Sequence, residues 1–367
     1  MGRGMLKSFE DEFATIEEEY HSCPKDELME RILETEKKVV IFGAGSVGTS
    51  LAHSLYNKLN GRFAAFCDTF KTGFSEKFQV PIISPEILVR DYKDAIIIIA
   101  IDLEYNDLLF NQVIDLGFPE ENIFQRYGGY KFYDIDIFKY HYEGYRWAYN
   151  FFEDDISRKI ILDRIRCYLF FMHMEHFPPK DQYFEKDIME FSDTEVFIDG
   201  GCYTGDTIIE FIKRVNNSFS HIYGFEPDIE NYEKAKTNLA LINNIDIFNN
   251  GLWDKEDTLP FDSKGNGSSR IDNKGLTTVH LISLDSFLEN KHIPTFIKMD
   301  IEGAEKQAIL GAKNIIEKYR PRLAVCVYHK PEDIYELTKL INDMNQYRFK
   351  LRHYSKSNIE TVLYAYI

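Results

Sequence analysis

The sequence predicts an α/β protein with two domains, each built around a mainly parallel sheet. The main observation is a pattern that occurs twice, near residues 43 and 201: an apolar segment, a glycine turn, a helical segment and a second apolar segment that ends in an acid. After each occurrence, apolar and helical segments continue to alternate. A chain of 367 residues, of which 44% are hydrophobic, is long enough for two such domains.

The charge and the apolar segments exclude several classes of partner. A net charge of -17 opposes binding to phosphate backbones, so no nucleic acid is expected. The longest apolar run, Ala95 to Ile101, is too short to cross a bilayer, and the N-terminus lacks a signal-peptide core. The 5 cysteines are scattered and never form Cys-x-x-Cys, which fits a reducing compartment. We therefore expect a cytoplasmic protein without a membrane span.

The first third of the chain is expected to hold a helical segment and a small Rossmann-like domain. Residues 1–35 place apolar residues at helical spacing. The domain follows over residues 36–127, with strands predicted at 38–42, 62–68, 81–83, 95–101 and 123–124. The region is short for a complete dinucleotide-binding domain.

This first domain contains the spacing Gly-x-Gly-x-x-Gly, with an acid about 20 residues later, which is the dinucleotide fingerprint. The candidate residues for a second nucleotide site are Gly43, Gly45, Ser46, Val47, Gly48 and Asp68. Such a site would hold NAD or a nucleotide sugar, and taken alone it would indicate an NAD(P)-dependent sugar oxidoreductase or epimerase. The alternative that this domain only packs stays open.

Residues 128–191 are expected to form a helical connector rich in aromatic residues, which more often pack than stack on bases or sugars. The second domain is expected over residues 192–367. Its strands are predicted at 196–199, 220–225, 245–253, 295–300, 322–328, 347–352 and 361–367, and residues 279–283 form a further apolar segment. The last two have no helix between them, so a terminal antiparallel hairpin is expected.

Four strands of the second domain end in polar groups, namely Asp199, Glu226, Asp300 with Glu302, and His329. Ligands of a doubly wound sheet gather beyond the carboxyl ends of its strands, so this convergence predicts a functional site. The turn reads Asp-x-Gly-x-x-x-Gly rather than Gly-x-Gly-x-x-Gly, which favours S-adenosylmethionine over a dinucleotide. Glu226 would accept hydrogen bonds from the ribose hydroxyls.

From about Asp181 onward, the chain resembles the FkbM family of S-adenosylmethionine-dependent methyltransferases. The resemblance rests on the segments 197–207, 224–227, 283–288, 297–305 and 360–364. It implies a class I methyltransferase fold with a seven-stranded sheet. It also implies a set of cofactor-binding residues: Asp199, Gly200, Gly201, Tyr203, Gly205, Asp206, Thr207, Phe225, Glu226, Pro227, Asn250, Gly251, Leu252 and Asp300. Tyr203 stands where this fold often has a third glycine.

The resemblance implies methyl transfer to a hydroxyl, and the first domain suggests a sugar, nucleotide sugar or glycan precursor as the acceptor. His329 is the preferred base because its unperturbed pKa is near neutrality, with Asp300 and Glu302 as alternatives. These two carboxylates could instead bind a divalent metal. A nitrogen or carbon acceptor, a non-catalytic nucleotide-binding protein and a homo-oligomer stay open.

Overall fold

The computed structural model describes residues 7–22, 32, 34–101, 103–125, 134–170, 174–262, 270–271 and 277–367. The chain divides into two compact units. Unit 1 comprises Met1–Tyr140, Leu162–Glu175 and Lys356–Asn358, and unit 2 comprises His141–Ile161, His176–Ser355 and Ile359–Ile367. The predicted connector is thus divided between them. The helical segment expected over residues 1–35 is described at 7–22, where a helix forms, and at 32, 34 and 35, whereas its other residues and the start of the connector fall outside the described residues.

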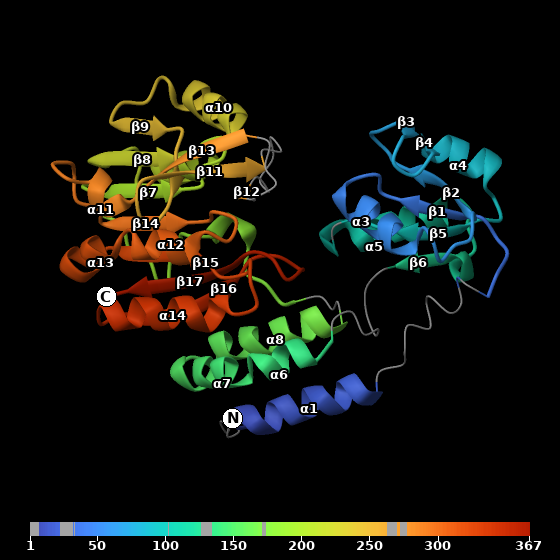
Figure 1. Cartoon of the computed structure of the whole chain (residues 1–367), viewed down its shortest axis with the longest axis horizontal. Helices are drawn as coiled ribbons and strands as arrows, with labels where there is room; N and C mark the ends of the chain where they lie inside the picture. The colour runs from blue at the N-terminus through green and yellow to red at the C-terminus, as the bar shows by residue number, and fades with distance from the viewer. Residues whose placement is uncertain are drawn as a thin grey trace. The chain divides into compact units, whose positions relative to one another are not determined.

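Unit 1 contains a six-stranded sheet in the order β3-β4-β2-β1-β5-β6, parallel except at the edge strand β3 (Figure 1). Its strands are β1 (Val39–Phe42), β2 (Phe63–Cys67), β3 (Gly73–Ser75), β4 (Val80–Ile83), β5 (Ile96–Ile99) and β6 (Ile123–Gln125). Its helices are α3 (Ser46–Leu55), α4 (Pro85–Asp91), α5 (Leu103–Asp115) and the 3-10 turn η1 (Glu120–Asn122). The sequence did not predict β3.

Helices cover both faces of this sheet, because successive side chains of a strand point to opposite sides. Val39 and Ile41 pack in one core with residues of α3. Val40 and Phe42 pack in a second core with residues of α4 and α5. Both faces of β1 are therefore buried, as its continuous apolar sequence predicts.

Three further helices contribute to unit 1: α1 (Phe9–Ser22), α6 (Asp136–Tyr140) and the C-terminal part of α8 (Asp155–Phe170). Glu17 of α1 forms an ion pair of 2.9 Å with Lys139 of α6. Glu19 of α1 forms one of 2.9 Å with Arg166 of α8. These pairs connect α1 to helices that lie far later in the chain.

Unit 2 is built on a seven-stranded sheet in the order β16-β17-β15-β14-β7-β8-β9, and its strands are stacked in that order in Figure 1. The strands are β7 (Val196–Gly200), β8 (His221–Phe225), β9 (Ile245–Phe248), β14 (Phe296–Met299), β15 (Arg322–Cys326), β16 (Arg348–His353) and β17 (Thr361–Tyr366). β17 runs antiparallel to both β15 and β16. The predicted seven-stranded sheet with a terminal antiparallel hairpin is confirmed.

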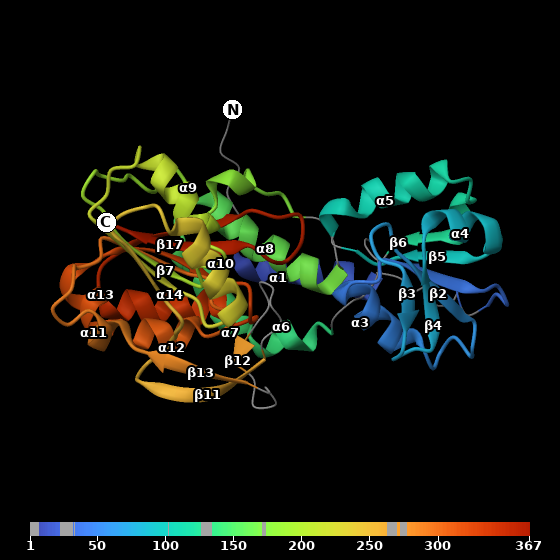
Figure 2. The same ribbon diagram turned by 90° about the horizontal axis from the view of Figure 1, so that it is seen from above.

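Helices flank this sheet on both sides (Figure 2). They are α7 (Tyr142–Phe151), the 3-10 turn η2 (Pro179–Asp181), α9 (Asp206–Arg214), α10 (Ile229–Leu239), α11 (Leu284–Phe287), α12 (Glu305–Leu310), α13 (Lys313–Tyr319) and α14 (Asp333–Met344). Phe211 of α9 and Leu239 of α10 share a core with Phe197 of β7. Helices α12, α13 and α14 lie on the opposite side of the sheet from α9.

A second, four-stranded sheet in unit 2 was not predicted. It has the order β10-β13-β11-β12, formed by β10 (Gly251–Leu252), β11 (Asp257–Asp262), β12 (Arg270–Ile271) and β13 (Thr277–Ile282). The sequence suggested one strand over residues 245–253, but the chain leaves the main sheet after β9. The Asn249 side chain donates to the carbonyls of Glu226 (2.9 Å) and Pro227 (3.0 Å), which fixes this break.

The aromatic residues of α7 pack against α14, as the packing interpretation expects. A Cβ at Gly144 would lie 2.5 Å from the ring of Tyr335, so glycine allows the close approach of the two helices. The Tyr335 hydroxyl lies 2.8 Å from Nδ1 of His141, and Tyr145 donates to the carbonyl of Pro331 at 2.7 Å. Helix α7 thereby supports the loop between β15 and α14.

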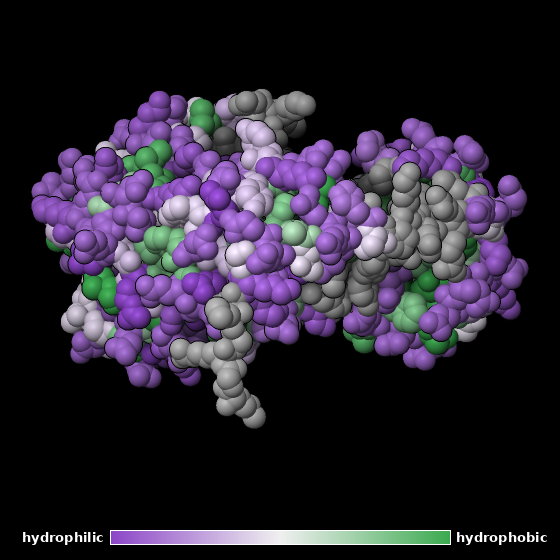
Figure 3. Space-filling model, turned by 90° about the horizontal axis from the view of Figure 1, so that it is seen from below, coloured by the Kyte–Doolittle hydropathy of each residue, from purple (hydrophilic) through white to green (hydrophobic). Residues whose placement is uncertain are grey.

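None of the described helices combines the length and apolar character that a membrane crossing needs. The face drawn in Figure 3 is mostly hydrophilic, with hydrophobic side chains in small scattered patches. This surface agrees with the high proportion of charged residues, 28% of the chain.

Candidate active site

The candidate site lies at the carboxyl edge of the main sheet of unit 2. Four adjacent strands meet there. His329 follows β15, Asp300 follows β14 and Glu226 follows β8, while Asp199 lies near the end of β7. The structure brings Asp300 and His329 within 3.7 Å of each other. It links Asp199 to the same group through a residue that the sequence analysis did not select, Lys298.

Lys298 and Asp199 form a buried ion pair in the centre of the sheet. Their charged atoms are 2.9 Å apart, and their side chains are 2% and 0% exposed. Lys298 also donates hydrogen bonds to the carbonyls of Gly200 (3.1 Å) and Gly201 (2.7 Å). Burial raises the pKa of Asp199 to about 6, although the lysine charge opposes that shift. The carboxylate is therefore ionised at neutral pH and held by the lysine.

This burial changes the expected role of Asp199. The resemblance implied that Asp199 binds the cofactor, but its carboxylate is enclosed and directed at Lys298. Asp199 and Lys298 instead fix the backbone of the turn that follows β7. We therefore interpret Asp199 as a residue that positions the turn.

The backbone conformation and close packing of this turn require its glycines, whether or not a ligand is bound. Gly201 and Gly205 both have positive φ angles, 74° and 83°. A Cβ at Gly201 would lie 1.9 Å from the carbonyl oxygen of Asp300, and one at Gly205 would lie 2.8 Å from Leu239. Tyr203 also has a positive φ, 46°, so the chain adopts there the conformation for which glycine is usual. The path of the turn is therefore kept without the third glycine.

Glu226 is directed at the same turn. One carboxylate oxygen accepts a hydrogen bond from the backbone N–H of Tyr203 and the other from that of Asp228, both at 2.9 Å. Burial raises its pKa to about 7, against the effect of these two hydrogen bonds. Each carboxylate oxygen has more than one acceptor position, so Glu226 can still accept from the hydroxyls of a ribose.

The other residues expected to bind cofactor fall into two groups. The Phe225 ring is 1% exposed and packs against Phe248 and Phe287. Leu252 is also buried, at 2% exposed. By contrast, exposed or partly exposed positions are found for Tyr203, Asp206, Thr207, Pro227, Asn250 and Gly251.

Asp300 is held by two tyrosines. The hydroxyl of Tyr183 donates to one carboxylate oxygen at 2.7 Å, and that of Tyr328 donates to the other at 3.1 Å. Burial tends to raise the pKa of Asp300, but the charges of Lys298 and His329 and these hydrogen bonds lower it overall. Asp300 is therefore ionised at neutral pH.

His329 is surrounded by three carboxylates. Its Nδ1 lies 3.1 Å from Glu305, and its Nε2 lies 3.7 Å from both Asp300 and Glu302. Burial lowers the pKa of the imidazole, but the three acids outweigh burial and raise it to about 9. This differs from the near-neutral pKa for which His329 was selected. Without a ligand, the ring is protonated at neutral pH.

Several residues of this cluster were missed by the sequence analysis: Lys298, Tyr183, Tyr328, Glu305 and Glu360. Lys298 had a detectable signal, because it is a charged residue inside an otherwise apolar strand. Glu360, in the loop between β16 and β17, accepts a hydrogen bond from Gln182, and burial with the charge of Asp300 raises its pKa to about 7. Nothing in its local sequence indicates that it lies near Asp300.

Three of these side chains could hold a metal ion together. Among the described residues, Asp300, Glu305 and His329 each offer one ligand atom, and the three atoms lie within 4.8 Å of one another. The sequence analysis expected Asp300 and Glu302 as metal ligands. In the structure Glu305, rather than Glu302, groups with Asp300 and His329, although Glu302 also lies close to His329.

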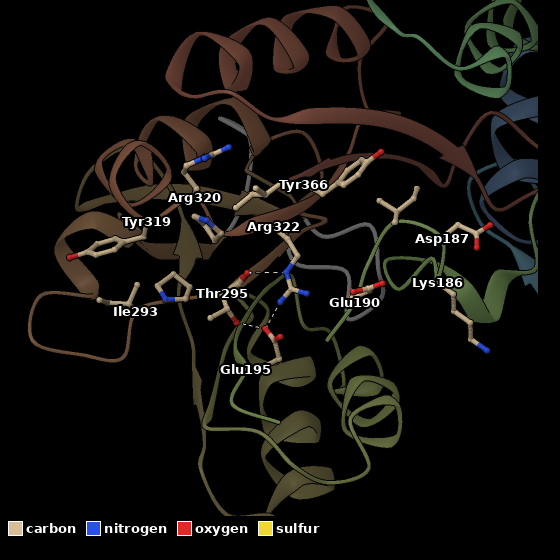
Figure 4. Close-up of a pocket in the computed structure, with 14 residues that line it drawn as sticks. Lys186, Asp187, Glu190, Glu195, Ile293, Thr295, Tyr319, Arg320, Arg322 and Tyr366 are labelled. Atoms are coloured by element: carbon tan, nitrogen blue, oxygen red, sulfur yellow. Dashed lines mark hydrogen bonds and ion pairs between the residues drawn. The ribbon is translucent and has the colours of Figure 1, made fainter. Parts of the chain in front are cut away.

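A cavity of about 630 Å³ lies at the opposite edge of the sheet (Figure 4). It is lined by Glu195, Thr295 and Arg322, which immediately precede or begin strands β7, β14 and β15. Arg322 is neutralised there by Glu195 at 2.5 Å. Because these residues lie at the amino ends of the strands, this cavity is separate from the candidate site.

The fingerprint turn of unit 1 has the geometry that its spacing predicts. A Cβ at Gly48 would lie 1.8 Å from the carbonyl oxygen of Gly43, so the turn requires glycine there. A Cβ at Gly45 would have no neighbour within 4 Å, so space is open beside it. Asp68 accepts a hydrogen bond from the backbone N–H of Ala44 at 2.9 Å, which links the acid to the turn.

The sheet order and the terminal antiparallel hairpin give unit 2 the fold of a class I methyltransferase. Residues 199–354 match the protein family described as "Methyltransferase FkbM domain". The chain therefore carries an FkbM methyltransferase domain and is an S-adenosylmethionine-dependent methyltransferase.

Comparison with solved structures shows the same fold over almost the whole chain. Methyltransferase FkbM from Methylobacillus flagellatus KT matches with a TM-score of 0.69 and 22% identity, over 97% of each chain. Precorrin-6y C5,15-methyltransferase from Geobacter metallireducens GS-15 has a TM-score of 0.33 and 11% identity, over 48% of this chain and 82% of its own. A SAM-dependent methyltransferase from Aquifex aeolicus has a TM-score of 0.29 and 14% identity, over 47% and 84%. No curated protein matches the sequence.

The buried ion pair gives a stability prediction. Lys298→Met leaves the Asp199 charge buried without its partner, so the free energy of unfolding should fall by about 3–5 kcal/mol in urea denaturation. Lys306→Met is the matched control, because Lys306 pairs with Glu336 at 2.7 Å on the surface. Its loss should cost less than about 1 kcal/mol. Equal losses in the two variants would contradict the role given to Lys298.

Proposed function

We propose that this chain transfers a methyl group from S-adenosylmethionine to a hydroxyl of a sugar, nucleotide sugar or glycan precursor. The observation that carries the proposal is the arrangement at one sheet edge. Glu226 and the turn it binds lie beside strand β7, and the cluster of Asp300, Glu302 and His329 follows the neighbouring strands β14 and β15. The proposed nucleoside site and this cluster of ionisable groups are therefore adjacent.

The described residues fit the cofactor. The acceptor capacity that remains on Glu226 suits the two ribose hydroxyls, and Pro227 is partly exposed beside it. Tyr203, which is 37% exposed, and the start of α9 at Asp206 border the same turn. When bound, S-adenosylmethionine supplies an electrophilic methyl group on a positively charged sulfur. The ionised Asp300 would favour that charge nearby.

The acceptor must be aligned with the methyl group and lose its proton during transfer. His329, Asp300 and Glu302 are the groups that we propose for aiding this deprotonation. The proposal of oxygen as the acceptor atom follows from the resemblance to the FkbM family, and the support for a sugar is weaker. It comes from the fingerprint turn at Gly43 to Gly48 and Asp68, which we propose as a site for a nucleotide or nucleotide sugar.

The pKa of Glu226 predicts how cofactor binding depends on pH. With a pKa of about 7, the carboxylate is mostly ionised at pH 8 and mostly protonated at pH 6. A protonated carboxyl loses an acceptor for the ribose, so the affinity for S-adenosylhomocysteine should fall by up to about tenfold between pH 8 and pH 6. Isothermal titration calorimetry measures this change.

Two variants control that measurement. Glu226→Gln should bind weakly and lose the pH dependence, whereas Glu230→Gln, which changes an exposed acid of α10, should keep it. If Glu226→Gln bound the ligand as tightly as the unchanged protein at pH 8, Glu226 would not hold the ribose.

His329 is predicted to act on turnover more than on cofactor affinity. His329→Ala should leave S-adenosylhomocysteine affinity nearly unchanged and lower turnover by roughly two orders of magnitude, as the loss of a proton-transfer group does. Production of S-adenosylhomocysteine with a sugar acceptor, followed by mass spectrometry, measures the rate. Unchanged turnover would remove His329 from the mechanism.

Product analysis also separates the alternatives. Fragmentation of the methylated product distinguishes an oxygen acceptor from nitrogen or carbon. A non-catalytic nucleotide-binding protein would form no S-adenosylhomocysteine with any acceptor. A sugar oxidoreductase or epimerase that uses unit 1 would bind NAD in calorimetry and change the nicotinamide absorbance when sugars are added.

A further inference from the structure

We propose that Asp300, Glu305 and His329 form a binding site for a divalent cation such as Mn²⁺, and that this cation holds the acceptor oxygen. The cation site itself is independent of the reaction, whereas its role toward the acceptor rests on the proposed methyl transfer. Three observations carry the site: the separation of the ligand atoms, the support of the carboxylates, and the state of the imidazole.

The three side chains come from separate elements and converge on one point. Asp300 follows β14, Glu305 is the first residue of α12, and His329 follows β15. Their ligand atoms lie within 4.8 Å of one another. Around a cation with bonds of roughly 2.1 Å, neighbouring ligand atoms are about 3 Å apart and opposite ones about 4 Å. Shifts of less than about 1 Å would therefore bring the three atoms into coordination.

Both carboxylates are oriented by neighbouring donors, as metal-binding carboxylates usually are. Tyr183 and Tyr328 donate to the two oxygens of Asp300. Glu305 accepts from the backbone N–H groups of Ile301 at 3.0 Å and Gly303 at 3.4 Å.

The backbone between the two acids explains how they meet. Glu302 and Gly303 have positive φ angles of 55° and 91°, and they reverse the chain so that Glu305 returns toward Asp300. Glu305 is only 1% exposed. A buried carboxylate that is turned back toward a second carboxylate requires positive charge beside it, which a bound metal ion or a protonated His329 would supply.

His329 points into this group without a well-formed hydrogen bond. Its side chain is 10% exposed, and both ring nitrogens are buried without a hydrogen-bond partner, although carboxylate oxygens lie 3.1 to 3.7 Å away. One imidazole nitrogen with two carboxylates is a ligand set for divalent first-row metals. The competing explanation is a protonated imidazole that balances the acids without metal, and it predicts no cation binding.

A cation at this point would lower the pKa of an acceptor hydroxyl bound to it. The hydroxyl proton passes to solvent, and the new oxygen–methyl bond forms as the sulfur–methyl bond breaks. The sulfonium becomes the neutral thioether of S-adenosylhomocysteine, and no oxidant or reductant is needed. The reaction is therefore balanced with the cation unchanged.

Binding of Mn²⁺ to the full chain tests the site directly. After treatment with EDTA and desalting, electron paramagnetic resonance should show one Mn²⁺ bound per chain. Glu305→Gln and His329→Ala should each weaken binding at least tenfold, since each removes a ligand. Glu317→Gln, which changes an acid of α13 paired with Lys313 on the surface, should bind as the unchanged protein does. Retained S-adenosylhomocysteine binding shows that each variant is folded.

The inference is overturned if the chain binds no Mn²⁺, or if folded Glu305→Gln and His329→Ala bind it as well as Glu317→Gln. Methyl transfer in EDTA, with and without added Mn²⁺, separates this outcome from a failure of the proposed function. Transfer at the same rate in EDTA overturns the cation's role and leaves the methyltransferase proposal intact. Mn²⁺ binding without transfer to any hydroxyl supports the site and counts against the proposed reaction.

Discussion

The buried ion pair between Lys298 and Asp199 is the interaction on which the rest of the site depends. Both side chains are almost completely buried, and removing two charges from water is costly unless they are paired and hydrogen-bonded. The lysine meets this requirement by donating to the carbonyls of Gly200 and Gly201 as well. One charged group thus joins the neighbouring strands β7 and β14 to the turn where the cofactor is proposed to bind.

The consequences of this pair reach both halves of the site. On one side, the fixed turn presents the backbone N–H of Tyr203 to Glu226. On the other side, the lysine charge helps to keep Asp300 ionised while Asp300 also lies close to His329. The parallel register of the sheet places these groups at one edge, because Lys298 pairs with Asp199 across the strands. The buried charge of Lys298 therefore interacts with both the turn that Glu226 binds and the cluster of Asp300 and His329.

Much of the architecture could be predicted from the sequence, because it depends on local patterns. Apolar runs, glycine turns and strand-end acids identify the seven-stranded sheet, its terminal hairpin and the positions of Asp199 and Glu226. The orientation of a side chain is not a local property. Asp199 and Phe225 were expected to touch the cofactor, yet both are buried, one against Lys298 and the other among phenylalanines.

The residues that the sequence analysis missed depend on contacts between distant segments. Tyr183 lies 117 positions before Asp300, and Glu305 meets His329 only because a left-handed turn reverses the chain. The pKa of His329 likewise depends on contacts between distant segments, which the local sequence does not reveal. The residue type suggests a near-neutral base, but three acids from other segments raise its pKa to about 9.

The central claim is that the carboxyl edge of the unit 2 sheet binds S-adenosylmethionine through Glu226. Calorimetric titration of S-adenosylhomocysteine into the full chain and into Glu226→Ala tests it most directly, with NAD as the comparison ligand. The account predicts binding to the unchanged protein and a large loss of affinity in Glu226→Ala, with no effect of this variant on any binding of NAD. Absence of S-adenosylhomocysteine binding, or equal affinity in the two proteins, would contradict it.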